Sequence, residues 1–201
     1  MPAFLDAVRE RAGSGQFAAT ADAEILENGS PPAGVFIAAW NDAAGRMAFW
    51  EDAGRAAFET HFGGAAHAAA LAAPGVPPGG DPDDPDLPCR ASVVPVTGSG
   101  AALMLVQGSV TDPERIGRYR DIIRPLLLDN GGYYILYTLA DRVEVLAGRW
   151  AEHALIVSIW PARDNARAFW DCETYQHTAI PARAGAGRFT VYLVPALRGD
   201  D

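Results

Sequence analysis

In the second half of the chain, apolar residues recur with two different spacings, and these spacings predict its secondary structure. Alternating apolar residues predict strands, whereas apolar residues three and four positions apart predict helices. The first helix has clear ends, because Asp112 and Pro113 suit a first turn and Asn130-Gly131 favours termination. Strands are predicted at residues 102–110, 133–139 with an extension to 148, 154–160 and 189–194, and helices between residues 112 and 130 and at 164–172. The order βαββαβ is typical of a ferredoxin-like module.

The first half of the chain repeats most of this pattern. Its periodicity predicts helices at residues 4–11 and 43–61, further helical turns within 65–73, and strands at 17–26, 35–40 and 89–96. The opening strand, which this topology normally places in the centre of the sheet, is missing. We therefore expect either that another segment fills the gap or that the N-terminal module is rearranged.

A strand, a turn and a helix occur twice at a spacing of 120 residues. Trp40 aligns with Trp160, and the pair Phe49-Trp50 aligns with Phe169-Trp170, without a gap. Two copies are too few for a solenoid, but duplication within one chain can imitate a symmetric homodimer. We therefore predict an α+β fold in which two tandem ferredoxin-like modules form a pseudo-dimer.

The boundary between the two predicted modules lies near residue 98. The first module, residues 1–98, lacks its opening strand, and the second, residues 99–201, is complete. Residues 74–88 are rich in proline and aspartate, which predicts an extended, solvated loop. Its aspartates lack the glycine and glutamate positions of a calcium-binding EF-hand, so we expect this loop to cover or buttress a neighbouring pocket.

Charge and composition restrict the partners of this chain. A net charge of −9 without a basic stripe argues against nucleic acid and against an anionic membrane. No apolar run approaches the roughly 20 residues that cross a bilayer, and the N-terminus does not resemble a signal peptide. The two cysteines, Cys89 and Cys172, predict free thiols in a cytoplasmic protein. Because phosphate-binding and metal-ligand motifs are absent from the sequence, we expect no cofactor and no metal.

Strand alternation in the second module predicts a pocket. One face of its sheet reads as apolar and suited to helices, while the other mixes hydroxyls with aromatic rings. Covered by a second sheet, such a mixed face suits an apolar ligand with a few orienting polar groups; the alternative is a core with satisfied hydroxyls. We expect a hydrophobic small molecule to contact Tyr134, Ser158, Trp160, Cys172 and Tyr192.

The candidate catalytic residues are Tyr175, His177 and Arg183. Tyr175 can orient or protonate a substrate oxygen, His177 titrates near neutrality, and Arg183 can hold a carboxylate or an enolate. The alternative is structural. Tyr175 and His177 face different sides of a helix, so Tyr175 can cap the core, and Arg183 can pair with an acid such as Asp171.

A further set of residues in the second half follows the order and spacing of a known family. The set comprises Thr111-Asp112-Pro113-Glu114, Tyr119-Arg120, Gly131-Gly132, Val143-Glu144-Val145-Leu146-Ala147-Gly148, Ala166, Phe169-Trp170, Tyr175-Gln176 and Arg183. Over residues 101–197 the chain resembles the domain-of-unknown-function-1330 (DUF1330) family, within the dimeric α/β-barrel superfamily. The resemblance implies a ferredoxin-like module whose sheet packs against a second sheet around a pocket. Members of the superfamily include cofactor-free quinone-forming monooxygenases, polyketide cyclases, lactone isomerases and haem-handling enzymes.

The chain departs from this family pattern at several positions. Ala147 stands where the family usually has a glutamate. In the first half, the offset of 120 places Arg55 at the position of Tyr175 and Gly63 at that of Arg183. The first half therefore does not repeat the candidate site, and we expect the C-terminal module to build it on an N-terminal scaffold.

Together these features predict a cofactor-independent enzyme that acts on a hydrophobic, oxygen-bearing small molecule. Proton-transfer chemistry in a biosynthetic pathway, such as cyclisation, isomerisation or dehydration, fits the Tyr, His and Arg side chains best. The alternatives are a cofactor-free monooxygenase, a non-catalytic binding or carrier protein, and an interaction module with an exposed sheet edge. Both a monomeric pseudo-dimer and a homodimer are compatible with the sequence.

Overall fold

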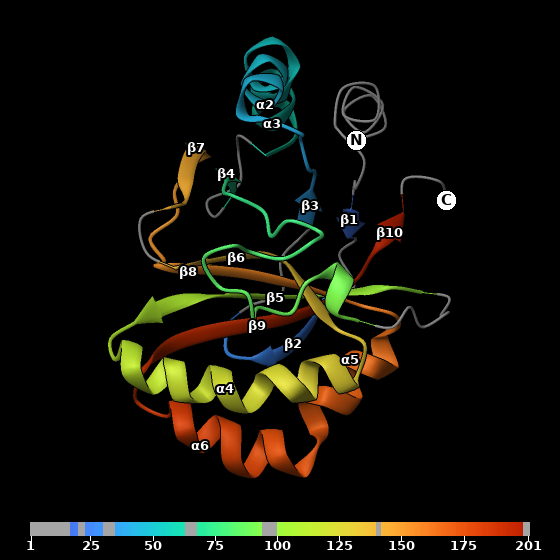
Figure 1. Cartoon of the computed structure of the whole chain (residues 1–201). Coiled ribbons are helices and arrows are strands. Elements are labelled where there is room, and N and C mark those ends of the chain that lie inside the picture. Colours follow the sequence, from blue (N-terminus) through green and yellow to red (C-terminus); the bar gives the residue numbers. More distant parts are fainter. Residues whose placement is uncertain are drawn as a thin grey trace.

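The centre of the protein is a five-stranded antiparallel sheet (Figure 1). The computed structural model describes residues 17–19, 23–29, 35–62, 68–93, 100–139 and 142–198. In spatial order the strands of the central sheet are β2 (Glu24–Glu27), β9 (Gly187–Pro195), β5 (Ala102–Val110), β8 (Ala154–Trp160) and β6 (Tyr133–Leu139). The second half of the chain supplies four of these strands and the first half supplies β2, so both halves share one sheet.

Helices cover one face of this sheet, the lower face in Figure 1. They are α4 (Pro113–Asp129), α5 (Arg163–Asp171) and α6 (Ile180–Arg183), with a π-helical turn, η4 (Tyr175–Ala179), before α6. The predicted start of α4 is confirmed, because the Asp112 carboxylate accepts a hydrogen bond from the Arg115 backbone N–H at 3.0 Å. Its predicted end is confirmed as well, since Gly131 takes the left-handed conformation with φ of 72°.

The predicted βαββαβ order of the second half is confirmed as β5-α4-β6-β8-α5-β9. The fold is therefore α+β, with the helices on one face of an antiparallel sheet. The predicted extension of the second strand is a separate strand, β7 (Glu144–Gly148), which leaves the central sheet and pairs with β4 (Ala69–Ala72) of the first half.

Three predictions for the first half are wrong. The single strand expected at 17–26 contains two, and they join different sheets: β1 (Phe17–Ala19) pairs with β3 (Val35–Ile37) and β10 (Leu197–Arg198), whereas β2 pairs with β9. The Ala-rich segment within 65–73 holds strand β4 instead of helical turns. The closing strand expected at 89–96 holds the 3-10 helix η2 (Arg90–Ser92).

Two of these errors have clear physical reasons. The backbone of β4 finds partners in β7, and tertiary pairing of this kind overrides the helix propensity of alanine. In η2 the Ser92 side chain accepts a hydrogen bond from the Cys89 backbone N–H, and this local bond competes with strand pairing. The predicted helix at 4–11 lies outside the described residues.

The helix predicted at 43–61 is confirmed, and its start closely resembles the equivalent position of the second half. It runs as α2 (Ala43–Phe49), the π-helical segment η1 (Trp50–Gly54) and α3 (Arg55–Phe62). The cap residues Asp42 and Ala162, 120 positions apart, have φ/ψ of −151/166° and −151/164°. The ring centroids of Trp40 and Phe49 are 5.3 Å apart, and those of Trp160 and Phe169 are 4.9 Å apart. The sequence repeat therefore corresponds to a repeated local structure.

The first half of the chain covers both edges of the central sheet. At one edge β2 pairs with β9, and the Asn28 side chain donates to the Phe189 carbonyl at 3.0 Å. At the other edge the Pro/Asp-rich loop runs beside β6, where the Val76 N–H donates to the Ile135 carbonyl at 3.0 Å and the Tyr134 N–H donates to the Pro88 carbonyl at 2.9 Å. The first half thus supplies one edge strand of the central sheet, β2, and a loop that bonds to the other edge strand, β6.

Candidate functional site

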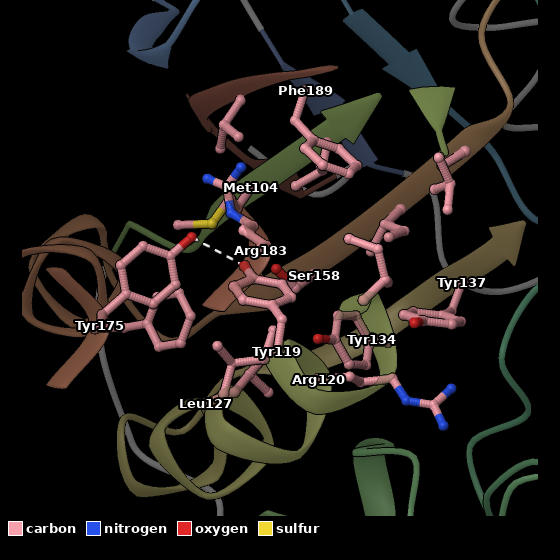
Figure 2. A pocket seen from close by; sticks show the side chains of 18 of the residues that line it. Met104, Tyr119, Arg120, Leu127, Tyr134, Tyr137, Ser158, Tyr175, Arg183 and Phe189 are labelled. Carbon is pink, nitrogen blue, oxygen red and sulfur yellow. Dashed lines mark hydrogen bonds between the residues drawn. The ribbon is translucent and has the colours of Figure 1, made fainter. Parts of the chain in front are cut away.

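A cavity lies between the central sheet and the helices that cover it (Figure 2). Its volume is about 60 Å³, which is room for a few water molecules. Most of its lining is apolar or aromatic, and the polar atoms belong to tyrosines, one serine and two arginines. The lining residues are Met104, Val106, Val110, Ile116, Tyr119, Arg120, Ile123, Leu127, Tyr134, Tyr137, Ala154, Ile156, Ser158, Trp160, Phe169, Tyr175, Arg183, Phe189 and Val191.

The cavity is on the helix side of the sheet, opposite to the side that we expected. In β8 the face with Ser158 and Trp160 meets the helices, not a second sheet. The other face holds a separate apolar cluster that includes Leu103 and Val157, against which Val35 and Ile37 of the first half pack. Strand alternation alone does not show which face meets the helices, so the mixed face was assigned to the wrong side.

A β-bulge in β6 brings two tyrosines into this cavity. The register with β8 pairs Tyr134 with Ser158 but Leu136 with Val157, so one extra residue interrupts the alternation. As a result Tyr134 and Tyr137 both line the cavity, with ring centroids 5.1 Å apart in an edge-to-face contact. Simple alternation places these two residues on opposite faces, which is what we expected from the sequence.

The most polar part of the cavity is formed by Tyr119, Tyr175 and Arg183. The hydroxyls of Tyr119 and Tyr175 are 3.1 Å apart and hydrogen-bonded, as Figure 2 shows. The Arg183 guanidinium lies 5.4 Å from the centroid of the Tyr119 ring and 5.2 Å from that of Phe189. Helix α4 supplies Tyr119, the π-helical turn supplies Tyr175 and α6 supplies Arg183, so three segments meet here.

Burial keeps these tyrosines in the neutral form. It raises the pKa of Tyr119 and, with the nearby Tyr119 phenol, raises the pKa of Tyr175 well above its ordinary value. Burial also raises the pKa of Tyr134 and of Tyr137. At neutral pH the tyrosines of the cavity therefore act as hydrogen-bond donors and not as bases.

Arg183 is charged and is paired with a residue of the first half. Burial alone lowers its pKa, but the hydrogen bond to Glu27 and the neighbouring tyrosines raise the pKa above the ordinary value. Nη1 donates to Oε1 of Glu27 at 3.0 Å, and Nη2 donates to Oε2. Arg183 is only 7% exposed, so this bidentate pair is a buried contact between the halves.

Arg120, the second arginine of the cavity wall, is also paired with a residue of the first half. Its Nη1 lies 3.2 Å from Oδ2 of Asp84, in the Pro/Asp-rich loop. The same carboxylate accepts hydrogen bonds from Arg124 at 2.6 and 2.7 Å. The predicted loop thus buttresses the cavity through its charge, with buried Leu87 as its apolar anchor.

The structure brings together five of the eight residues singled out from the sequence. The residues that line the cavity are Tyr134, Ser158, Trp160, Tyr175 and Arg183, and the Trp160 indole N–H donates to the Ser158 hydroxyl at 3.0 Å.

The structure places His177, Cys172 and Tyr192 outside this lining. The His177 side chain is exposed, because the π-helical turn directs its neighbours Tyr175 and Ala179 inward. The Cys172 thiol accepts a hydrogen bond from the Tyr175 backbone N–H at 3.4 Å and supports that turn. Tyr192 belongs to the apolar cluster on the opposite face of the sheet.

One proposed partner was wrong and several site residues were missed. Arg183 pairs with Glu27, whereas Asp171 forms an ion pair with Arg167. Tyr119 belongs to the family pattern but was given no role in the site; its hydroxyl on an otherwise apolar helix face is the available signal. The acids of the first half carry no such signal, because nothing in their local sequence indicates a partner so far along the chain.

The neutral tyrosines predict a loss of stability at alkaline pH. Below about pH 10, the pKa of tyrosine in an unfolded chain, the folded and unfolded chains both hold these protons and the stability is complete. As the pH rises from there towards the higher folded-state pKa values of Tyr119, Tyr134, Tyr137 and Tyr175, the unfolded chain loses protons that the folded chain keeps. Each tyrosine then lowers the free energy of unfolding by about 1.4 kcal/mol per pH unit.

Urea unfolding over a series of alkaline buffers measures this loss. We expect Tyr175→Phe to make the decline with pH shallower by about the contribution of one tyrosine. In the folded protein, followed in parallel, the four cavity tyrosines should contribute to the tyrosinate absorbance only above about pH 10. A stability that stays constant over this pH interval contradicts the prediction.

In the parts of the chain that the structure describes, no group of three or more His, Cys, Asp or Glu side chains is placed to hold a metal ion. No helix within the described ranges is long and apolar enough to cross a membrane.

Comparisons with known proteins give a family for the second half. The family model of the domain of unknown function DUF1330 matches residues 101–197. A crystal structure of RPA0582, a protein of unknown function from Rhodopseudomonas palustris and a structural genomics target, is similar at 15% sequence identity. The similarity covers 49% of this chain and 84% of that chain, with a TM-score of 0.41. No curated protein matches the chain.

The family match and the cavity coincide in the same part of the chain. Every residue that lines the cavity lies between Met104 and Val191, and the matched segment also contains β5, α4, β6, β8, α5 and β9. Residues 101–197, just under half of the chain, match the model of the DUF1330 family.

Proposed function

We propose that the cavity of the DUF1330 domain binds a small, largely apolar molecule that carries an oxygen group. The observation that carries this proposal is the hydrogen-bonded pair Tyr119–Tyr175 beside Arg183, within a lining that is otherwise mostly apolar. A concave apolar site with a few convergent polar groups is the usual form of a small-molecule site. The apolar walls supply affinity and the tyrosine hydroxyls fix the orientation of the ligand oxygen.

The size of the cavity supports a small ligand. A volume of about 60 Å³ holds a few water molecules, so a single ring with one substituent enters only if side chains adjust. Met104 at the wall is unbranched and flexible, and therefore suited to such an adjustment.

Cofactor-independent proton-transfer chemistry is a second candidate function. Neutral tyrosines donate hydrogen bonds that stabilise negative charge on a substrate oxygen, as the enolate intermediates of isomerisation, cyclisation and dehydration require. The described lining offers hydrogen-bond donors but neither a histidine nor a carboxylate as base. We therefore place binding first and turnover second; nothing in this lining favours cofactor-free oxygenation.

We also infer that residues 1–98 and 99–201 are related modules that arose by duplication and form a pseudo-dimer. The matching helix starts at Asp42 and Ala162 and the equivalent Trp–Phe contacts support this inference. Strands of the first module pair with strands of the second module. The two modules therefore no longer form separate sheets. A cytoplasmic location belongs to the same proposal and is supported by the free thiols of Cys89 and Cys172.

The effect of Tyr175→Phe on binding tests the proposed function. Acetophenone, a small apolar ketone, is titrated against the protein by ligand-observed NMR, and native mass spectrometry of the purified protein reports any retained molecule. Loss of one hydrogen bond to the ketone oxygen should weaken binding about three- to tenfold. Tyr192→Phe is the matched control, because it removes the same hydroxyl on the opposite face of the sheet and should leave the affinity unchanged. Equal effects of the two substitutions, or no binding to the wild-type protein, contradict the proposal.

A further inference from the structure

Both arginines that line the cavity are paired with acids of the first half of the chain. Arg183 pairs with Glu27 of β2, and Arg120 pairs with Asp84 of the Pro/Asp-rich loop. These acids approach from the two opposite edges of the central sheet, next to β9 and next to β6. The family segment therefore supplies the cavity walls, while the first half supplies a carboxylate to each of the two arginines, Asp84 being shared with Arg124.

The pair at Arg183 leaves little of its charge for a ligand. Both terminal nitrogens are bound to the Glu27 carboxylate, and the guanidinium lies near the rings of Tyr119 and Phe189. At 7% exposure the arginine has little access to water, so its interaction with Glu27 is weakly screened. A ligand carboxylate here must either displace Glu27 or lie beside it, and both are unfavourable.

At the other side of the cavity, Asp84 binds Arg120 and competes there with a ligand carboxylate. Asp84 binds Arg120 at 3.2 Å and Arg124 at 2.6 Å, and its side chain is 26% exposed. Burial alone lowers the pKa of Arg120, but the Tyr137 phenol and Asp84 raise it, so the arginine stays charged. Asp84 compensates part of this charge and shares its carboxylate with Arg124.

Each of the two arginines still has one N–H group without a hydrogen-bond partner in the described part of the chain. The Nε atoms of Arg183 and Arg120 are buried and have no hydrogen-bond partner among the described residues. A buried donor without a partner is costly, and a carbonyl or hydroxyl oxygen satisfies it without adding charge. The Tyr119–Tyr175 pair provides one further donor, because one hydroxyl donates to the other and the second keeps its proton for a ligand oxygen.

We infer that the cavity selects uncharged molecules with a carbonyl or hydroxyl oxygen over carboxylates, and that Glu27 and Asp84 determine this selectivity. The inference rests on the proposed function, since it names the ligand class of the same cavity. It also gives the first half of the chain a role beyond the scaffold expected from the sequence, because its acids set the charge of a site built by the second half.

Two probes of nearly the same shape test this inference. Acetophenone is neutral, whereas benzoate is ionised at neutral pH, and ligand-observed NMR gives the dissociation constant of each. We expect the wild-type protein to bind acetophenone at least about tenfold more tightly than benzoate. In Glu27→Gln, which frees the charge of Arg183, benzoate should bind about tenfold more tightly than to the wild type, while acetophenone changes less than about threefold.

The same strand offers a matched control in Glu24. This residue pairs with Arg163 at 2.5 Å and Arg167 at 2.9 Å, and neither arginine lines the cavity. Glu24→Gln therefore removes the same charge from β2 and should leave the affinities for both probes unchanged. Asp84→Asn is the second test variant, because it should favour benzoate even where Glu27→Gln does not fold.

The outcomes separate the inference from the proposed function. Equal binding of the two probes to the wild type, or tighter benzoate binding in Glu24→Gln as well, overturns the selectivity and leaves the cavity as a binding site. If neither probe binds to the wild type or to any variant, both the inference and the proposed function fail.

Discussion

Truncation of Trp160 to alanine is expected to lower the free energy of unfolding by about 3–5 kcal/mol. This side chain is 1% exposed and packs against Phe169 between the central sheet and α5. Gly132 lies directly against its ring, because a Cβ added there meets the ring carbons of Trp160 at 2.6 Å. The substitution therefore opens a large cavity in the core and also removes the hydrogen bond to Ser158.

Urea unfolding monitored by far-ultraviolet circular dichroism measures this loss. Trp40→Ala is the matched control, because Trp40 holds the equivalent position in the repeat and contacts Phe49, but it is only partly buried. Its indole N–H also has no hydrogen-bond partner among the described residues. We expect a smaller loss of about 1–2 kcal/mol for the control. Equal losses at the two positions contradict the assignment of Trp160 to the central core.

Arg183→Met is expected to destabilise the protein by about 2–4 kcal/mol. Methionine keeps much of the apolar contact with Tyr119 and Phe189, but it leaves the Glu27 carboxylate without its cation. An uncompensated charge in a partly buried position is unfavourable. The 25% exposure of the Glu27 side chain places the expected loss below that for a fully buried pair.

A double-mutant cycle separates the charge effect from simple loss of packing. Glu27→Gln in the Arg183→Met background should restore part of the lost stability, with a coupling energy of at least about 1 kcal/mol. Arg167→Met serves as the surface control, since its partners Glu24 and Asp171 are more accessible, and it should cost about 0–1 kcal/mol. Additive effects of the two substitutions at Arg183 and Glu27 contradict the pair.

The local structure of the second half could be predicted because each signal acts within a few residues. The cap at Asp112, the turn at Gly131 and the apolar spacing of α4 all concern neighbours along the chain. The repeated Trp–Phe contacts could be predicted for the same reason, since they join residues only nine positions apart.

The face of the sheet that forms the cavity and the acids that pair with its arginines depend on long-range contacts, which local periodicity does not encode. The bulge that turns both Tyr134 and Tyr137 into the cavity arises from pairing with β8 and breaks the alternation on which the face assignment relied. The partners Glu27 and Asp84 meet Arg183 and Arg120 only because the first half wraps around both edges of the sheet. Of the cavity residues that were identified, Ser158 and Trp160 lie on a predicted strand, whereas Tyr175 and Arg183 lie on η4 and α6, for which the periodicity predicted no element.

The pairing of β2 with β9 has a consequence for how the chain folds. Asn28 and Phe189, which are hydrogen-bonded, are 161 positions apart. During synthesis β2 is therefore unpaired until the intervening chain and β9 have been made. Contacts over such a separation form late and slowly. In the meantime Ile25 and Leu26 lie between Glu24 and Glu27, and flanking charges of this kind oppose aggregation of an unpaired strand. The two glutamates that bind arginines in the folded protein thus protect the same segment before it folds.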